Sequence, residues 1–311
     1  MKRNVVLLIV LIMISCQKEK MQIKILENGV LEGVPSASGI VKYQNHYYLI
    51  GDDSPFLFKL NLDLKHVSKD TVFSINELKD NRIRKAIKPD FETLELIEDK
   101  EIIIFGSGSK SPQRDIFIQI LLEKNTPKIK TFNITSFYTH LKKLAVLKNT
   151  ELNIEATAYY NGILYLFNRA NNVVFGFKYK DLIRFFNTNL EFPKPEIVRF
   201  NLPKINGITS GFSGATALKD KPLLFFTSSV EDTNNAYDDG EILGSFVGII
   251  DLKNGKLSKE NRSVLIPYST KPYKVESVVI DATFNTNEAI ALFVTDSDGG
   301  ESEMIKCKLN W

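Results

Sequence analysis

The sequence predicts an all-β fold, a five-bladed β-propeller with a few short helical insertions. Three observations carry this prediction: five segments repeat one β-rich pattern, two further strand-like runs follow each of the first four, and no long helical periodicity is present. Alternation of apolar and polar residues, rich in β-branched and aromatic side chains, is typical of half-buried antiparallel strands. A six-bladed ring, in which two blades have been read as one, is the alternative.

Each repeated segment begins with Ser or Glu and a small residue or Thr, and continues with a short strand, a turn and a second apolar strand. The first segment, "SGIVKYQNHYYLIGDDS", is representative. The segments begin 54 to 63 residues apart, and self-similarity at such a period indicates a repeat architecture. Their first residues are Ser38, Glu92, Glu155, Ser213 and Glu276.

The last repeat lacks a fourth strand, because the chain ends after "MIKCKLN" at 304–310. The segment "QIKILEN" at 22–28 can supply it. Pairing between these two segments would close the ring and cover both terminal edges, as closed β architectures require. We therefore expect residues 22–311 to form one propeller domain.

Three segments with amphipathic Leu, Ile and Phe spacing interrupt the strands, at 76–87, 136–148 and 180–186. An apolar stripe of this kind predicts a surface helix that packs on a blade edge. The first two lead directly into the repeats at Glu92 and Glu155, so they could also roof the face on which those carboxylates lie.

The N-terminus has the features of a secretory signal. Lys2 and Arg3 precede an apolar run from Val5 to Ile14, which is too short for a permanent membrane span. Ser15 followed by Cys16 resembles a bacterial lipoprotein cleavage box, and an ordinary signal peptide with an accidental cysteine is the alternative. We expect a signal peptide at 1–15, lipid on Cys16, a tether at 16–21, and a secreted protein anchored by lipid alone in the bacterial cell envelope, in the periplasm or outer membrane.

The composition argues against several function classes. Without Lys2 and Arg3, 38 basic residues face 37 acidic ones, so the net charge of +1 gives no reason to expect a nucleic-acid partner. The only cysteines are Cys16 and Cys307, and the three histidines are far apart in the sequence. A disulfide framework, a zinc site and a Ser-His-Asp triad therefore have little support, and we expect a monomer held by its hydrophobic core.

The heads of the five inner strands converge at one mouth of a propeller's central channel. Three carboxylates there would repel one another unless a cation or water neutralised them. Oxygen-only ligands favour a hard cation, Ca²⁺ ahead of Mg²⁺. The alternative is that these side chains only make hydrogen bonds with neighbouring backbone. The predicted metal ligands are Ser38, Glu92, Glu155, Ser213 and Glu276.

The ends of the second strands reach the same rim and extend the candidate site. The loop 106–114 offers hydroxyls, Lys110 and Arg114, which suit a phosphate or carboxylate, although a plain turn explains it equally well. The loop 230–244 is either a solvated acidic loop or a second calcium site. The predicted ligand-binding residues of the rim are Asp53, Ser107, Ser109, Arg114, Arg169, Glu231 and Asp296.

The order Ser, Glu, Glu, Ser, Glu at successive strand heads is similar to the central calcium ring of the calcium-activated nucleotidases (apyrases), which are five-bladed propellers. More distantly, the layout resembles the gluconolactonase and paraoxonase propellers and the phytase-like esterase propellers. The loops "GSGSKSPQR" and "EDTNNAYDDGEILGS" resemble those of an uncharacterised family of secreted bacterial propeller lipoproteins. The first of these resemblances implies bound calcium and hydrolysis of a phosphorylated substrate, and the last implies no activity.

Two functions therefore remain. One is a calcium-dependent hydrolase of a phosphorylated or lactone-like small molecule, in which the ion polarises the scissile bond or generates hydroxide and a rim carboxylate acts as base. The other is a non-catalytic propeller that binds a glycan, a peptide or a protein partner at its channel mouth. An unpaired carboxylate in a polar mouth would favour the hydrolase, whereas a mouth sealed by aromatic residues would favour binding alone.

Overall fold

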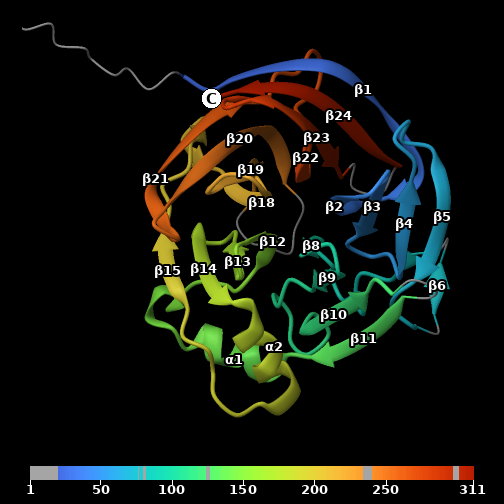
Figure 1. The fold of residues 1–311 in the computed structure, drawn as a ribbon, viewed down its shortest axis with the longest axis vertical. Coiled ribbons are helices and arrows are strands. Elements are labelled where there is room, and N and C mark those ends of the chain that lie inside the picture. The colour runs from blue at the N-terminus through green and yellow to red at the C-terminus, as the bar shows by residue number, and fades with distance from the viewer. Residues whose placement is uncertain (1–19, 76, 80–81, 124–126, 234–239, 297–300) are drawn as a thin grey trace, which may run out of the picture.

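Five four-stranded antiparallel sheets surround a central axis in the computed structural model (Figure 1). The structure describes residues 20–75, 77–79, 82–123, 127–233, 240–296 and 301–311. The predicted five-bladed propeller is confirmed. The signal peptide and Cys16 lie outside the described residues, as do 234–239 of the acidic loop.

The inner strands of blades 1 to 5 follow the predicted repeats. Blade 1 contains β2 (Ala37–Tyr43), β3 (His46–Gly51), β4 (Phe56–Leu60) and β5 (His66–Thr71). Blade 2 contains β8 (Glu95–Ile97), β9 (Glu101–Phe105), β10 (Ile116–Leu121) and β11 (Lys128–Asn133). Blade 3 contains β12 (Ile154–Tyr160), β13 (Ile163–Asn168), β14 (Val173–Lys178) and β15 (Glu196–Arg199). Blade 4 contains β18 (Gly211–Ala217), β19 (Leu223–Asp232), β20 (Glu241–Lys253) and β21 (Lys256–Leu265).

Blade 5 closes the ring with both ends of the chain. Its inner strands are β22 (Val275–Asn285), β23 (Glu288–Thr295) and β24 (Glu301–Asn310), and its outer strand is β1 (Gln22–Pro35). In the antiparallel register Gln22 lies opposite Asn310 and Asn28 lies opposite Ile305. The predicted pairing of 22–28 with the last strand is confirmed, and it satisfies backbone groups that would otherwise form an open edge.

Two of the three expected helices are present. The helix α1 (Thr135–Lys142) is followed by the short 3₁₀ helix η1 (Ala145–Leu147), and α2 (Tyr179–Thr188) lies within blade 3. Figure 1 shows both α-helices at the periphery, beside β11 and β14, and not over the channel. Phe137 of α1 and Phe186 of α2 lie with ring centroids 5.2 Å apart, so the helices fill the space between blades 2 and 3. Neither α-helix in the described part of the chain has the length and apolar character needed to cross a bilayer.

The prediction of a helix at 76–87 is wrong. Its described part forms a small hairpin of β6 (Leu78–Lys79) and β7 (Arg82–Ile83). The N–H of Ile83 donates to the carbonyl of Asp53 at 2.8 Å, and the side chain of Arg82 pairs with the same residue. The N–H of Ile83 and the side chain of Arg82 are therefore bound to blade 1 and are not available to a local helix. Tertiary contacts commonly override helix propensity in this way.

A second hairpin, β16 (Lys204–Ile205) with β17 (Ile208–Thr209), was not predicted. Asn206 and Gly207 form its turn with φ of 51° and 85°. Both angles match a type I′ turn, for which Asn-Gly is the preferred pair. This sequence signal is strong, so the hairpin could have been predicted.

Candidate functional site

Four of the five predicted strand heads are β-bulges. The pairing register skips one residue between Ala37 and Gly39, between 154 and 156, between 212 and 214, and between 275 and 277. The skipped residues are Ser38, Glu155, Ser213 and Glu276. A bulge re-aims a side chain at the end of a strand. The fifth head, Glu92, lies between an isolated bridge formed by Phe91 and the start of β8.

The two serine heads bind the neighbouring blade. The hydroxyl of Ser38 donates to the carbonyl of Phe91, and that of Ser213 donates to the carbonyl of Val275 at 2.6 Å. Both serines are buried. For these two positions the structure contains the backbone hydrogen bonds that the sequence offered as the alternative to metal ligation, and their role as calcium ligands stays a prediction.

Glu155 is held by two neighbours. Asn153 donates to its Oε1 at 2.5 Å, and Nη1 of Arg169 lies 3.6 Å from its Oε2. Nη2 of the same arginine lies 3.0 Å from Oε2 of Glu231 in blade 4. Burial raises the pKa of the Glu155 carboxyl above its usual range, and the positive charge of Arg169 opposes that rise. Arg169 therefore bridges two blades and two carboxylates.

Lys274 links blades 4 and 5. Its Nζ lies 3.5 Å from Glu231, 3.6 Å from Glu276 and 3.4 Å from Asp296. Burial raises the pKa of Glu276 well above its usual range, although Lys274 favours the ionised form. One ammonium group is thus the counter-ion of three carboxylates from two blades. Lys274 was not among the predicted site residues. The only local signal is a basic residue two positions before a strand head.

Lys88 and Arg114 form the corresponding network between blades 1 and 2. Lys88 pairs with Asp52 and lies 2.8 Å from Asp90. Arg114 also pairs with Asp90, and the hydroxyl of Ser107 donates to the same carboxylate at 2.6 Å. Ser109 joins this group through Ser107 and Arg114. The loop expected to bind a phosphate therefore contacts a carboxylate of the chain itself.

Asp53 completes the rim. Its Oδ2 accepts from Nε of Arg82 at 2.7 Å, and Arg82 also donates to Ser36. Burial raises the pKa of Asp53, the charge of Arg82 opposes this rise, and the negative charge of Asp296 in blade 5 adds to it. The predicted rim residues therefore belong to three clusters of charged and polar side chains. These are centred on Asp90, on the pair Arg169 and Lys274, and on the pair Asp53 and Arg82.

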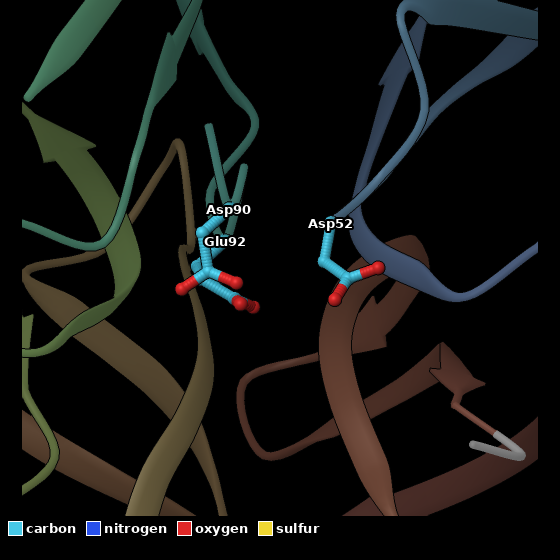
Figure 2. Close-up of side chains that lie close together, drawn as sticks. All are labelled: Asp52, Asp90 and Glu92. Carbon is cyan, nitrogen blue, oxygen red and sulfur yellow. The ribbon is translucent and has the colours of Figure 1, made fainter. Parts of the chain in front are cut away.

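Asp52, Asp90 and Glu92 form a carboxylate cluster that could bind a metal ion. One oxygen from each lies within 4.8 Å of the others, and Figure 2 shows Asp52 facing the other two from the opposite side. The backbone N–H of Glu92 donates to the carbonyl of Phe105 at 3.2 Å, but its carboxylate makes no hydrogen bond and no ion pair with any described residue. Oδ1 of Asp52 is buried without a hydrogen-bond partner. Burial raises the pKa of Asp52 to about 7. Burial, and then the charges of Glu155, Asp90 and Asp52, raise the pKa of Glu92 well above its usual range.

A cavity of ≈ 880 Å³ opens beside this network between blades 3 and 4. Its lining includes Asn153, Arg169 and Glu231. The volume lies within the range typical of small-molecule sites, about 300–1,000 Å³. The charged mouth therefore has a space beside it in which a ligand could contact the network.

A family model covers nearly all of this chain. It is described as "Family of unknown function (DUF6929)" and matches residues 33–309. The chain belongs to this family. No curated protein matches the DUF6929 chain. Among solved structures it is similar to the glutaminyl cyclase of Myxococcus xanthus, with 8% identity, a TM-score of 0.53, and coverage of 94% of this chain and 97% of the cyclase.

A streptogramin B lyase has a lower TM-score of 0.39 against the DUF6929 chain, with 10% identity and coverage of 93% of this chain and 97% of the lyase. At these identities the similarity to the cyclase shows the propeller fold and nothing more. The resemblance of the strand heads to the apyrase ring stays a prediction.

Proposed function

We propose that this DUF6929 chain is a calcium-dependent hydrolase of a phosphorylated or lactone-like small molecule that acts at the charged mouth of its propeller. The observation that carries the proposal is Glu92, whose carboxylate has a raised pKa and makes no hydrogen bond or ion pair with a described residue, while lying within 4.8 Å of Asp52 and Asp90. Groups of this kind are typical of catalytic acids and bases and of cation sites.

The cation would be held by Asp52, Asp90 and Glu92. Calcium takes six to eight oxygen ligands, so water and substrate oxygens would complete the shell. Asp52 already presents a buried oxygen without a partner. Lys88 now lies between Asp52 and Asp90, and its ammonium group would have to withdraw as the ion enters. The bound ion would polarise the scissile bond or a water molecule, and a rim carboxylate would accept the proton.

The substrate would occupy the cavity between blades 3 and 4. Arg169 and Glu231 line this cavity, and Glu231 contacts both Arg169 and Lys274. Guanidinium and ammonium groups at this position suit a phosphate or a carboxylate. That the cyclase neighbour is named as an enzyme supports the view that this architecture can host catalysis, although fold does not determine function.

A non-catalytic binding propeller is the second candidate, and one observation favours it. Glu155, Glu231 and Glu276 already have partners in Arg169 and Lys274. Because the chain's own cations already contact these carboxylates, the network does not require an ion, and the mouth would then bind a glycan, peptide or protein partner through its polar rim. In either case we propose that the protein is a secreted monomer anchored in the cell envelope by lipid on Cys16.

The decisive experiment measures the melting temperature and hydrolysis with calcium, with magnesium and with a chelator. An ion that binds only the folded state stabilises it by mass action, so calcium should raise the melting temperature more than magnesium does. Glu92→Gln should abolish this response, whereas Glu191→Gln, an exposed carboxylate after α2, should retain it. No shift with either ion would end the calcium proposal. A shift without hydrolysis of an aryl phosphate or an aryl lactone would favour the binding propeller.

A further inference from the structure

The opposite mouth of the channel contains a second cavity, distinct from the charged rim described above. Its volume is ≈ 710 Å³, and residues near the far ends of the inner strands β2, β8, β12, β18 and β22 line it. All five blades therefore contribute to one cavity, which is open to solvent. A cavity built by the whole ring has the shape expected of a binding site, because ligand sites are concave and largely pre-formed.

The walls of this second mouth are aromatic and acidic. Tyr43, Tyr159 and Tyr160 line the cavity and are partly exposed. Glu95 also lines it, although this residue is only 7% exposed. Its carboxylate accepts a hydrogen bond from the N–H of Leu96 at 3.0 Å and makes no ion pair with any described residue. A buried carboxylate without a counter-ion, facing an open cavity, is a costly feature that a positively charged ligand would relieve.

The other charges at this mouth already have partners, with the exception of the exposed Asp220. Lys42 lies 2.6 Å from Asp281, and Lys219 lies 2.7 Å from Asp99. Glu98 pairs with Lys100 and accepts a hydrogen bond from the hydroxyl of Tyr159. The charged residues that line the cavity are two lysines and five carboxylates: Lys42, Lys219, Glu95, Glu98, Asp99, Asp220 and Asp281. Their excess of negative charge favours a cation over an anion.

We propose that the second mouth binds a small organic cation, a protonated amine or a quaternary ammonium group, with Glu95 as its counter-ion and the tyrosines as its aromatic wall. Tyrosine rings attract such cations through their negative faces. This inference is independent of the calcium site, because it uses no residue of the charged rim.

Choline is the probe for this proposal, and its neutral carbon analogue 3,3-dimethylbutanol is the matched control. Burial raises the pKa of Glu95 to about 8. Hydrogen bonds from the backbone of Leu96 and Tyr159 and the positive charge of Lys219 lower this pKa, but burial is the larger effect. Glu95 is then mostly protonated at pH 7 and must ionise to bind the cation. Choline keeps its charge at every pH, so its affinity should rise about tenfold from pH 7 to pH 9, with release of a proton that calorimetry in two buffers detects.

Glu95→Gln replaces a protonated carboxyl with an amide of the same shape, so the variant should fold. At pH 9 the affinity of the Glu95→Gln variant for choline should be at least about tenfold lower than that of the unmodified protein, and it should no longer depend on pH. Glu191→Gln should change neither the affinity nor its pH dependence. Equal binding of choline and 3,3-dimethylbutanol would overturn the proposal, as would choline binding that Glu95→Gln leaves unchanged. Absence of choline binding at millimolar concentration at pH 9 would also overturn it.

Discussion

Replacing Lys274 with Met tests the structural account of the charged mouth most directly. One ammonium group lies 3.4–3.6 Å from carboxylates of Glu231, Glu276 and Asp296, and these four side chains are between 7% and 14% exposed. At 3.5 Å and an effective dielectric constant of about 20, each pair of unit charges attracts by about 5 kcal/mol before desolvation is subtracted. Removing the shared cation from such a buried group should cost about 3–5 kcal/mol, because it leaves carboxylates without a counter-ion.

The assay is urea denaturation at pH 7 with a chelator present, followed by tyrosine or tryptophan fluorescence. The matched control is Lys100→Met. Lys100 makes a shorter contact with Glu98, 2.8 Å, but both side chains are at least half exposed, so this substitution should cause no measurable loss. A loss below about 1 kcal/mol for Lys274→Met would refute the reasoning, because buried pairs broken on one side cost more than that.

Three further predictions follow from the fold and the charges. The folded-state pKa values of Glu92 and Glu276 lie well above their unfolded values; the native state then binds more protons, so metal-free protein should lose stability as the pH rises above about 4.5. In urea titrations between pH 5 and pH 8, Glu92→Gln should flatten this loss, and an unchanged slope would contradict the burial of that charge. Lipid on Cys16 predicts membrane fractionation of the protein expressed with its signal and release by Cys16→Ser; identical fractionation of both proteins would count against the anchor. Deleting residues 20–28 should expose the edge of β24 and cause aggregation, and a soluble, monomeric product of unchanged melting temperature would contradict the role of β1 in closure.

The repeat pattern allowed the blades to be predicted because strand alternation is a local property of the sequence. The same pattern placed Ser38, Glu155, Ser213 and Glu276 at equivalent positions, and all four are bulges in the structure. The bulge itself could not be predicted, since it depends on the register with the second strand. The closing strand was predictable because the last repeat lacked a partner.

The counter-ions of the site were harder to predict than its carboxylates. Lys274 and Lys88 precede their strand heads and carry no motif, and their roles depend on which blades become neighbours in the closed ring. Asp90 was missed for the same reason, although it binds Lys88 and Arg114 together. The prediction of a helix at 76–87 failed because Arg82 and Ile83 contact Asp53, which lies between β3 and β4 of blade 1, 29 residues before Arg82 in the chain.

The closing pair of β1 and β24 also constrains the order in which this protein can fold. Gln22 lies opposite Asn310, so β1, the first strand of the propeller, must wait for β24, its last strand, before blade 5 exists. Contacts between such distant residues form slowly, because a long loop must close before they contribute any stability. Blades 1 to 4 can assemble from neighbouring segments of the chain, whereas the ring closes only once β24 is present. A chain that stops a few residues early would leave two complementary edges open on one molecule, and neighbouring copies could then pair through them.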